Sequence, residues 1–267
     1  MKILSLFIFW LHLLLLSVPA LAKETLTFAY QDSENFPYQL GNGQTIPTLL
    51  PGLAVDIVKL AAKRLNLTVK LVRMPWKRAL VSLGANQVDG VFNASFKRVR
   101  ERYGVYPMIE GHVDASKKSY ANSYSFYGLK SSKLSFENKQ LLPHSPKMKV
   151  VTIRGFSIAE DLKNMNVRVV EVSTVAEAFH LLKLGRVKVA AIFSLSGDFY
   201  LKKDQNIYRD IVKIEPPIKT KNYYLMLSKQ FVRNHPKLAT RIWQEIGKIR
   251  ASGEINTLSE KYFSELK

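Results

Sequence analysis

The chain contains no cysteine among its 267 residues. Disulfides, a thiolate nucleophile, a cysteine-ligated zinc site and a lipid-modified N-terminal cysteine are therefore excluded. The five histidines show no spacing typical of a metal site, and the sequence has neither a Gly-x-Ser-x-Gly nucleophile motif nor a phosphate-binding loop. We expect no metal and no cofactor.

Acidic residues are scarce, because 21 Asp and Glu stand against 40 Lys and Arg, for a formal net charge of +19. Such an excess favours contact with nucleic acid, anionic membranes or anionic solutes. The basic residues are scattered and do not form one stripe interleaved with aromatics, so we expect no nucleic-acid partner. The charge is assigned first to a solvated surface and second to attraction toward acidic envelope surfaces.

The N-terminal segment carries a long apolar run, residues 3–18, which follows Lys2 and ends near Ala20-Leu21-Ala22. This is the pattern of a secretory signal with an A-x-A cleavage site. We predict that residues 1–22 are removed and that the mature chain begins at Lys23 in a bacterial periplasm. An uncleaved membrane anchor is the alternative, but the run is shorter than the ~20 apolar residues that a spanning helix needs.

The first part of the mature chain alternates strand and helix patterns. We predict strands at residues 24–30, 68–72 and 88–93, and helices at residues 53–65 and 76–83. Alternation of this kind predicts a parallel sheet with right-handed crossover connections.

The same alternation starts again further along the chain and predicts a second core. Two of its helices begin with capping-box patterns, Ser157 to Glu160 and Thr174 to Glu177. The predicted elements are strands at 149–153, 167–172 and 187–193, helices at 157–163 and 174–184, and two closing helices within 236–263.

A loop after the third strand presents one hydroxyl, Ser95, and one guanidinium, Arg100, where a small anion can be held at the carboxyl end of a parallel sheet. Other short motifs precede and follow these two residues along the chain. The full order is Pro51-Gly52-Leu53, Asp56-Ile57, Trp76, Asp89-Gly90, Ser95, Arg100 and Tyr106-Pro107.

This order resembles the family 3 extracellular solute-binding proteins of bacterial amino-acid uptake systems, over nearly all of residues 23–263. In the second part, Gly155-Phe156-Ser157 and the run from Leu182 through Gly185-Arg186-Val187 to Val189 are similar to the same family. The resemblance implies an α/β, two-lobed type II periplasmic binding fold, with two parallel or mixed sheets flanked by helices and joined by a two-segment hinge.

The resemblance also implies how the chain is divided and used. Lobe 1 is expected at residues 23–123 plus 222–267, lobe 2 at 124–221, and the hinge at 120–125 and 216–223. A monomeric receptor of this kind binds an amino acid or related carboxylate between its lobes, closes around it, and delivers it to an inner-membrane ABC permease. No catalytic residue is expected.

Eight residues are assigned to the ligand site by the resemblance. Arg100 matches the arginine that pairs with a ligand carboxylate, with Arg98 as the competing candidate, and Ser95 either adds a hydroxyl or forms a turn. Gly155 and Ser157 either offer backbone amides to the ligand or only begin a helix. Aromatic residues form the pocket walls or belong to the core; these are Tyr30, Phe36, Tyr38 and Trp76.

One departure leaves the ligand class open. Amino-acid binders of this family place an aspartate for the ligand ammonium at a position that falls here at Phe193 or Ser194. Asp198 lies a few residues further on and substitutes only if its loop folds back. The ligand is therefore an amino acid, or a carboxylate or other anion without an ammonium group.

Two other functions fit the same fold. A periplasmic cyclohexadienyl dehydratase would need a general acid in the cleft, for which Asp32, Glu34 and Asp198 are the candidates, although none lies in a recognisable motif. A ligand-binding sensor that docks on a membrane kinase cannot be separated from a transport receptor by sequence.

Overall fold

The structure, a computed structural model, describes residues 25–143 and 145–264. The predicted signal peptide, residues 1–22, lies outside the described residues. No helix within these ranges combines the length and the apolar character that crossing a bilayer requires.

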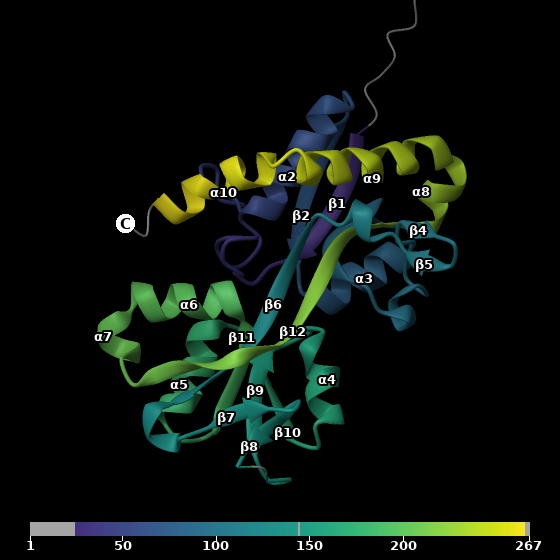
Figure 1. Cartoon of the computed structure of the whole chain (residues 1–267). Helices are drawn as coiled ribbons and strands as arrows, with labels where there is room; N and C mark the ends of the chain where they lie inside the picture. The colour runs from purple at the N-terminus through teal and green to yellow at the C-terminus, as the bar shows by residue number, and fades with distance from the viewer. Residues whose placement is uncertain (1–24, 144, 265–267) are drawn as a thin grey trace, which may run out of the picture.

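The helices and strands form two groups, which we call lobe 1 and lobe 2 (Figure 1). Lobe 1 contains β1 (Thr25–Gln31), α2 (Leu53–Arg64), β2 (Thr68–Met74), α3 (Trp76–Gly84), β3 (Gly90–Ser95), β4 (Met108–Ile109), β5 (His112–Val113), α8 (Lys229–Asn234), α9 (Pro236–Ala251) and α10 (Glu254–Ser264). Lobe 2 contains β7 (Ser135–Glu137), β8 (Gln140–Leu142), β9 (Lys149–Ile153), α4 (Ile158–Asn164), β10 (Arg168–Val172), α5 (Val175–Lys183), β11 (Val189–Phe193), α6 (Ser194–Lys203) and α7 (Gln205–Tyr208).

Two long strands, β6 (Tyr120–Leu129) and β12 (Ile211–Leu227), run between the lobes and pair with each other in both of them (Figure 1). They join the strands into one eight-stranded sheet with the order β10-β9-β11-β6-β12-β3-β1-β2. The two expected sheets are therefore continuous through the connecting strands. The pairing register shifts between Ile214 and Lys219, where Pro216 and Pro217 lack the N–H groups that a ladder needs.

The predicted strand and helix alternation is confirmed in both lobes. β1 pairs in parallel with β2 and β3, and β9 pairs in parallel with β10 and β11, as expected of crossover units. The strands β6 and β12 and the helices α6, α7 and α8 were not predicted, since no helix or strand was assigned to residues 94–148 and 194–235.

The two capping predictions had different outcomes. Thr174 caps α5 as predicted, because its Oγ1 accepts a hydrogen bond from the Glu177 backbone N–H at 3.1 Å. The prediction for Ser157 is wrong, since its side chain caps nothing. Its backbone is already helical (φ −67°, ψ −16°), whereas a capping residue is extended, and Glu160 pairs with Lys97 instead.

Gly52 fixes the start of α2 against the loop that follows β1. Its φ is +121°, and a side chain there would place a Cβ 2.4 Å from the Tyr38 carbonyl oxygen and from the Gln39 Cα atom. The Gly52 backbone N–H donates to the Tyr262 hydroxyl at 3.0 Å. Only glycine allows this approach of two backbone segments, which positions Gln39 beside the site described next.

Buried Arg73 holds the rest of the same loop. Its guanidinium donates hydrogen bonds to four backbone carbonyl groups and makes none to a carboxylate among the described residues. The loop therefore has defined backbone positions although it contains no long element. The four carbonyl groups belong to Asp32, Leu40, Gly41 and Thr45.

Candidate ligand-binding site

A small cavity lies between the lobes, at the carboxyl ends of β1, β3 and β11 and after the end of β9. We call it the interlobe cavity. Its volume is about 30 Å³, which is room for about one water molecule. Lobe 1 lines it with Gln31, Asn35, Gln39, Trp76, Asn93, Ser95 and Arg100, lobe 2 with Gly155, Phe156, Ser157 and Phe193, and the connecting strands with Tyr120, Tyr124 and Tyr223.

Arg100 is the cation of this cavity. Its side chain is buried, and one of its nitrogens donates to the Ser95 carbonyl oxygen at 2.8 Å and to Ser95 Oγ at 3.0 Å. The guanidinium lies 5.2 Å from the centre of the Trp76 ring, and no carboxylate pairs with it among the described residues. A buried guanidinium with unused donors is suited to binding an anion.

Four further predicted residues line the same cavity. Ser95 lies beside Arg100, and Trp76 packs against Gly155, whose φ is +80° and whose added Cβ would lie 3.0 Å from the Trp76 ring. Ser157 is buried, and its hydroxyl lies close to those of Tyr124 and Tyr223 without a hydrogen bond of standard geometry. Arg98, the competing candidate, is exposed and does not line the cavity.

The other three predicted residues lie outside the cavity lining. Tyr30 stacks on Phe92 at 4.6 Å, Tyr38 stacks on Tyr120 at 3.8 Å, and Phe36 stacks on Phe199 of α6 at 3.9 Å. Tyr38 therefore supports a lining residue from behind, and Phe36 joins the two lobes. The sequence placed all three near the end of β1 but did not show which way each ring points.

A network of carboxamides forms part of the lobe 1 wall, and the sequence reasoning did not find it. Asn93 donates to the Gln39 side chain at 2.5 Å and accepts a hydrogen bond from the Tyr120 hydroxyl at 3.0 Å. Gln39 in turn donates to the backbone carbonyls of Gln31 and Ser33. A signal was present, because Asn93 is a polar residue inside a strand whose other residues, up to Ala94, are apolar or glycine.

The described residues of the lobe 2 wall include no carboxylate. Phe193 lines the cavity at the end of β11, and Ser194 bonds to Ser125 Oγ at 2.7 Å. Asp198, the possible substitute, points elsewhere: it accepts a hydrogen bond from Tyr127 at 2.8 Å and pairs with Lys213 at 3.0 Å. The Asp198 loop does not fold back, because these residues continue α6.

Two sets of contacts join the lobes. In the first, Ser196 of α6 donates to Asn35 Oδ1 or to the Phe36 carbonyl oxygen, each at 2.7 Å, and Tyr200 donates to Glu34 at 3.0 Å. In the second, Lys97 of lobe 1 pairs with Glu160 of lobe 2. The lobes are thus in direct contact.

Asp161 of α4 links lobe 2 to the connecting strand β12. It pairs with Lys219 at 2.9 Å and also with Lys221, which donates to the Ser157 carbonyl oxygen. Burial raises the pKa of this carboxyl, but the hydrogen bonds from the two lysines outweigh burial and hold the pKa below its ordinary value of 3.8. The charged carboxylate is the form that the fold stabilises.

This shift predicts a pH dependence of stability. A carboxyl with a lowered pKa in the folded state stabilises the fold above its unfolded pKa, and that contribution is lost as the pH falls through about 4 and below. We expect urea midpoints to fall less between pH 5 and pH 2 in Asp161→Asn than in the unmodified protein. Asp210→Asn, at a carboxylate that is 72% exposed, is the control and should follow the unmodified curve. Parallel curves for all three proteins would contradict the assignment.

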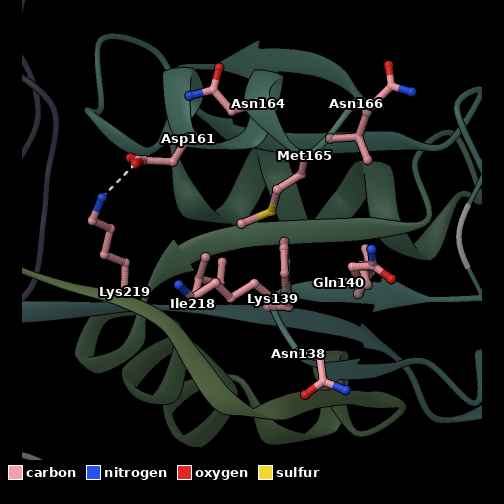
Figure 2. A pocket seen from close by; sticks show the side chains of 12 residues that line it. Asn138, Lys139, Gln140, Asp161, Asn164, Met165, Asn166, Ile218 and Lys219 are labelled. Atoms are coloured by element: carbon pink, nitrogen blue, oxygen red, sulfur yellow. Dashed lines mark hydrogen bonds and ion pairs between the residues drawn. The ribbon is translucent and has the colours of Figure 1, made fainter.

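A second cavity, of about 890 Å³, lies in lobe 2 between α4, the β7–β8 hairpin and β12 (Figure 2). Figure 2 shows Met165 reaching toward Ile218, while the carboxamides of Asn164 and Asn166 point away. Its described lining residues come from lobe 2 and its adjoining strands. A ligand there would not bridge the lobes, so the interlobe cavity remains the candidate site.

The fold and the site together define a class. Two α/β lobes joined by a pair of strands, with a cavity at the carboxyl ends of strands from both lobes, form a type II periplasmic binding fold. The profile of the bacterial extracellular solute-binding proteins, family 3, matches residues 27–265. The chain belongs to this family.

Solved structures share the fold at low sequence identity. A mutant of the arginine-binding protein of T. maritima is 19% identical, with a TM-score of 0.66 over 90% of this chain and 95% of that one. A putative ABC-transporter binding component from Wolinella succinogenes, complexed with lysine, is 15% identical, with a TM-score of 0.70 over 90% and 95%. A histidine kinase sensor domain is 16% identical, with a TM-score of 0.68 over 90% and 96%. No curated protein sequence matched.

Proposed function

We propose that this protein is a periplasmic receptor that captures a small polar or anionic solute, an amino acid or related carboxylate, and delivers it to an inner-membrane ABC permease. The observation that carries the proposal is the buried guanidinium of Arg100 in the interlobe cavity, without a carboxylate partner among the described residues. Membership of the solute-binding family supports it, as does the similarity to a binding component of an ABC transporter.

In this proposal Arg100 and Ser95 bind the ligand carboxylate from lobe 1. Gly155 and Ser157 approach it from lobe 2, and Trp76 forms a wall between them. Tyr38 supports the wall from behind, with Tyr30 deeper in lobe 1, and Phe36 stabilises lobe contact. The export signal and a monomeric state belong to the proposal, as do lobe boundaries at 23–123 plus 222–267 and 124–221.

Closure of the lobes would be a shift of population toward the conformation in which both walls contact the ligand. The contacts of Ser196 with Asn35 and Phe36 are available only when the lobes meet, because they join residues of different lobes. Ligand affinity should therefore depend on them, although Ser196 itself does not line the cavity.

Closure can be tested by small-angle scattering and calorimetry with a panel of amino acids and carboxylates. We expect a bound ligand to reduce the radius of gyration. Ser196→Ala should bind the same ligand roughly 5- to 150-fold more weakly, because the two buried acceptors that share the single Ser196 proton lose it in the closed form. Ser131→Ala, at an exposed lobe 2 serine, is the matched control. No ligand-dependent change of shape across the panel would refute the receptor proposal.

One alternative has its own support. The similarity to a histidine kinase sensor domain favours a receptor that passes its closed form to a kinase, and co-purification of the closed form with a permease or with a kinase would separate the two. A dehydratase is less favoured, since no Asp, Glu or His lies among the described residues that line the interlobe cavity.

A further inference from the structure

We propose that the ligand is a small carboxylate without an ammonium group, of the 2-hydroxy acid type, and that the site discriminates against amino acids. This inference rests on the proposed function, because it assumes that the interlobe cavity is the ligand site. It is carried by three independent features of the cavity: its charges, the packing of its aromatic rings, and its neutral hydrogen-bonding groups.

The described lining of the cavity has one charged side chain, Arg100. Among the carboxylates around it, Asp161 pairs with two lysines, Asp198 pairs with Lys213, and Glu171 accepts a hydrogen bond from the Gly155 backbone N–H at 3.3 Å. Asp32 lines a neighbouring cavity, which shares Gln31, Trp76 and Gly155 with the interlobe cavity and also contains two cations, Lys77 and Arg154. The described lining of the interlobe cavity is therefore positive and holds no counter-charge for an ammonium.

Aromatic rings can bind an ammonium through their faces, which carry the negative part of the ring quadrupole. Several of these faces are already covered here. Tyr120 stacks with Tyr38 at 3.8 Å and with Tyr223 at 5.0 Å, Phe193 stacks on Tyr124 at 4.3 Å, and the Arg100 guanidinium lies 5.2 Å from the centre of the Trp76 ring. The rings therefore offer less face to a cation, while the tyrosine hydroxyls can donate to an anion or a neutral acceptor.

The phenol groups of these tyrosines stay neutral. Burial raises the pKa of Tyr124 and of Tyr223 well above the ordinary value of 10, so both hydroxyls keep their protons. They bond to each other at 3.1 Å, which leaves one of the two protons for another acceptor. They are therefore neutral hydroxyls that can donate to an anion, and they are not anionic partners for a cation.

Neutral groups suited to a ligand hydroxyl lie in the same cavity. The buried Ser157 hydroxyl lies close to the Tyr124 and Tyr223 hydroxyls without a hydrogen bond of standard geometry, and the carboxamides of Gln31 and Asn35 also line the cavity. A hydroxyl on the ligand can donate to or accept from such groups without a charge to compensate. A ligand whose carboxylate binds Arg100 and whose hydroxyl binds these neutral groups would match the charge and the hydrogen-bonding groups of the cavity.

Matched ligand pairs test this directly on the mature chain. Each pair differs only in ammonium or hydroxyl: L-alanine and L-lactate, L-phenylalanine and L-phenyllactate, L-glutamate and L-2-hydroxyglutarate. Calorimetry should show that the hydroxy acid of at least one pair binds tenfold or more tightly than its amino acid. Glycine betaine, which carries a cation without N–H donors, should not bind.

The outcomes separate this inference from the proposed function. If the amino acid binds more tightly than its hydroxy acid in the pairs that bind, or if glycine betaine binds, the proposed receptor function would stand. The proposed ligand class, a 2-hydroxy acid, would be wrong. No binding by any of these compounds, together with no closure by the wider panel, would remove the receptor proposal and the inference with it.

A charge placed on the lobe 2 wall gives a second test. Phe193→Asp makes the described lining neutral overall, which suits a zwitterion and repels a monoanion, so the preference within a pair should shift at least tenfold toward the amino acid. Phe193→Asn introduces a side chain of nearly the same shape as aspartate but without the charge. This variant should keep the preference of the unmodified protein for the hydroxy acid. Thermal unfolding of each variant establishes that it is folded. An equal preference in folded Asp and Asn variants would contradict the assigned role of charge.

Discussion

Replacing Arg100 with alanine should weaken ligand binding by roughly 30- to 4,000-fold. A truncated charge pair of this kind costs about 2–5 kcal/mol, since the ligand carboxylate is then buried without its partner. Arg100→Lys should recover only part of the loss, because an ammonium cannot form the two parallel hydrogen bonds of a guanidinium. Calorimetric titration with the tightest ligand of the panel measures both.

Arg98→Ala is the matched control for this prediction. Arg98 lies two residues away in the same short 3₁₀ turn, Arg98–Arg100, carries the same charge, and is exposed where Arg100 is buried. It should change affinity by less than about threefold, the range of a screened surface charge. The reverse ranking of the two variants would move the anion site to Arg98.

Gly52→Ala should lower the free energy of unfolding by about 2–6 kcal/mol. About half of this comes from forcing a side chain into the +121° φ region, and the rest from the new Cβ meeting the backbone of Tyr38 and Gln39 at 2.4 Å. Backbone atoms cannot rotate away as a side chain can. Urea unfolding followed by circular dichroism gives the value.

Gly43→Ala separates strain from crowding. Gly43 also has a positive φ, +78°, but no atom lies within 4 Å of its added Cβ. It should therefore cost only the left-handed strain, about 1–2 kcal/mol. Equal losses in the two variants would mean that the contact between Gly52 and the Tyr38–Gln39 backbone contributes nothing. If folded Gly52→Ala can be recovered, its ligand affinity should also fall, since Gln39 lines the cavity.

The parts of the fold in which strands and helices alternate could be predicted, because each helix or strand there has a recognisable pattern of apolar residues. The α2 helix carries buried residues at helical spacing, and β11 is a short run of apolar residues that is buried throughout. The connecting strands escaped prediction for a physical reason. β12 crosses from one core to the other, so its burial pattern changes along its length, and it contains two prolines.

The residues of the site also fall into a predicted group and a group that was missed. Arg100, Ser95, Trp76, Gly155 and Ser157 were predicted from the resemblance of their local motifs to the family, and the structure brings all five to one cavity. Asn93, Tyr120 and Tyr223 were missed because their place depends on which strands are neighbours. The pairing of Tyr223 with both Ser95 and Tyr120 across β12 is information about strand order, which no single segment carries.

Because the two lobes are joined by strands that are hydrogen-bonded to each other, their relative motion has few independent directions. Sliding of one strand along the other would break the ladder on both sides of the shift between Ile214 and Lys219, whereas bending across the pair at that gap breaks little. The opening of the molecule should thus follow a single angular coordinate. A single distance, measured by spectroscopy between one dye on each lobe, would then suffice to report ligand occupancy in real time.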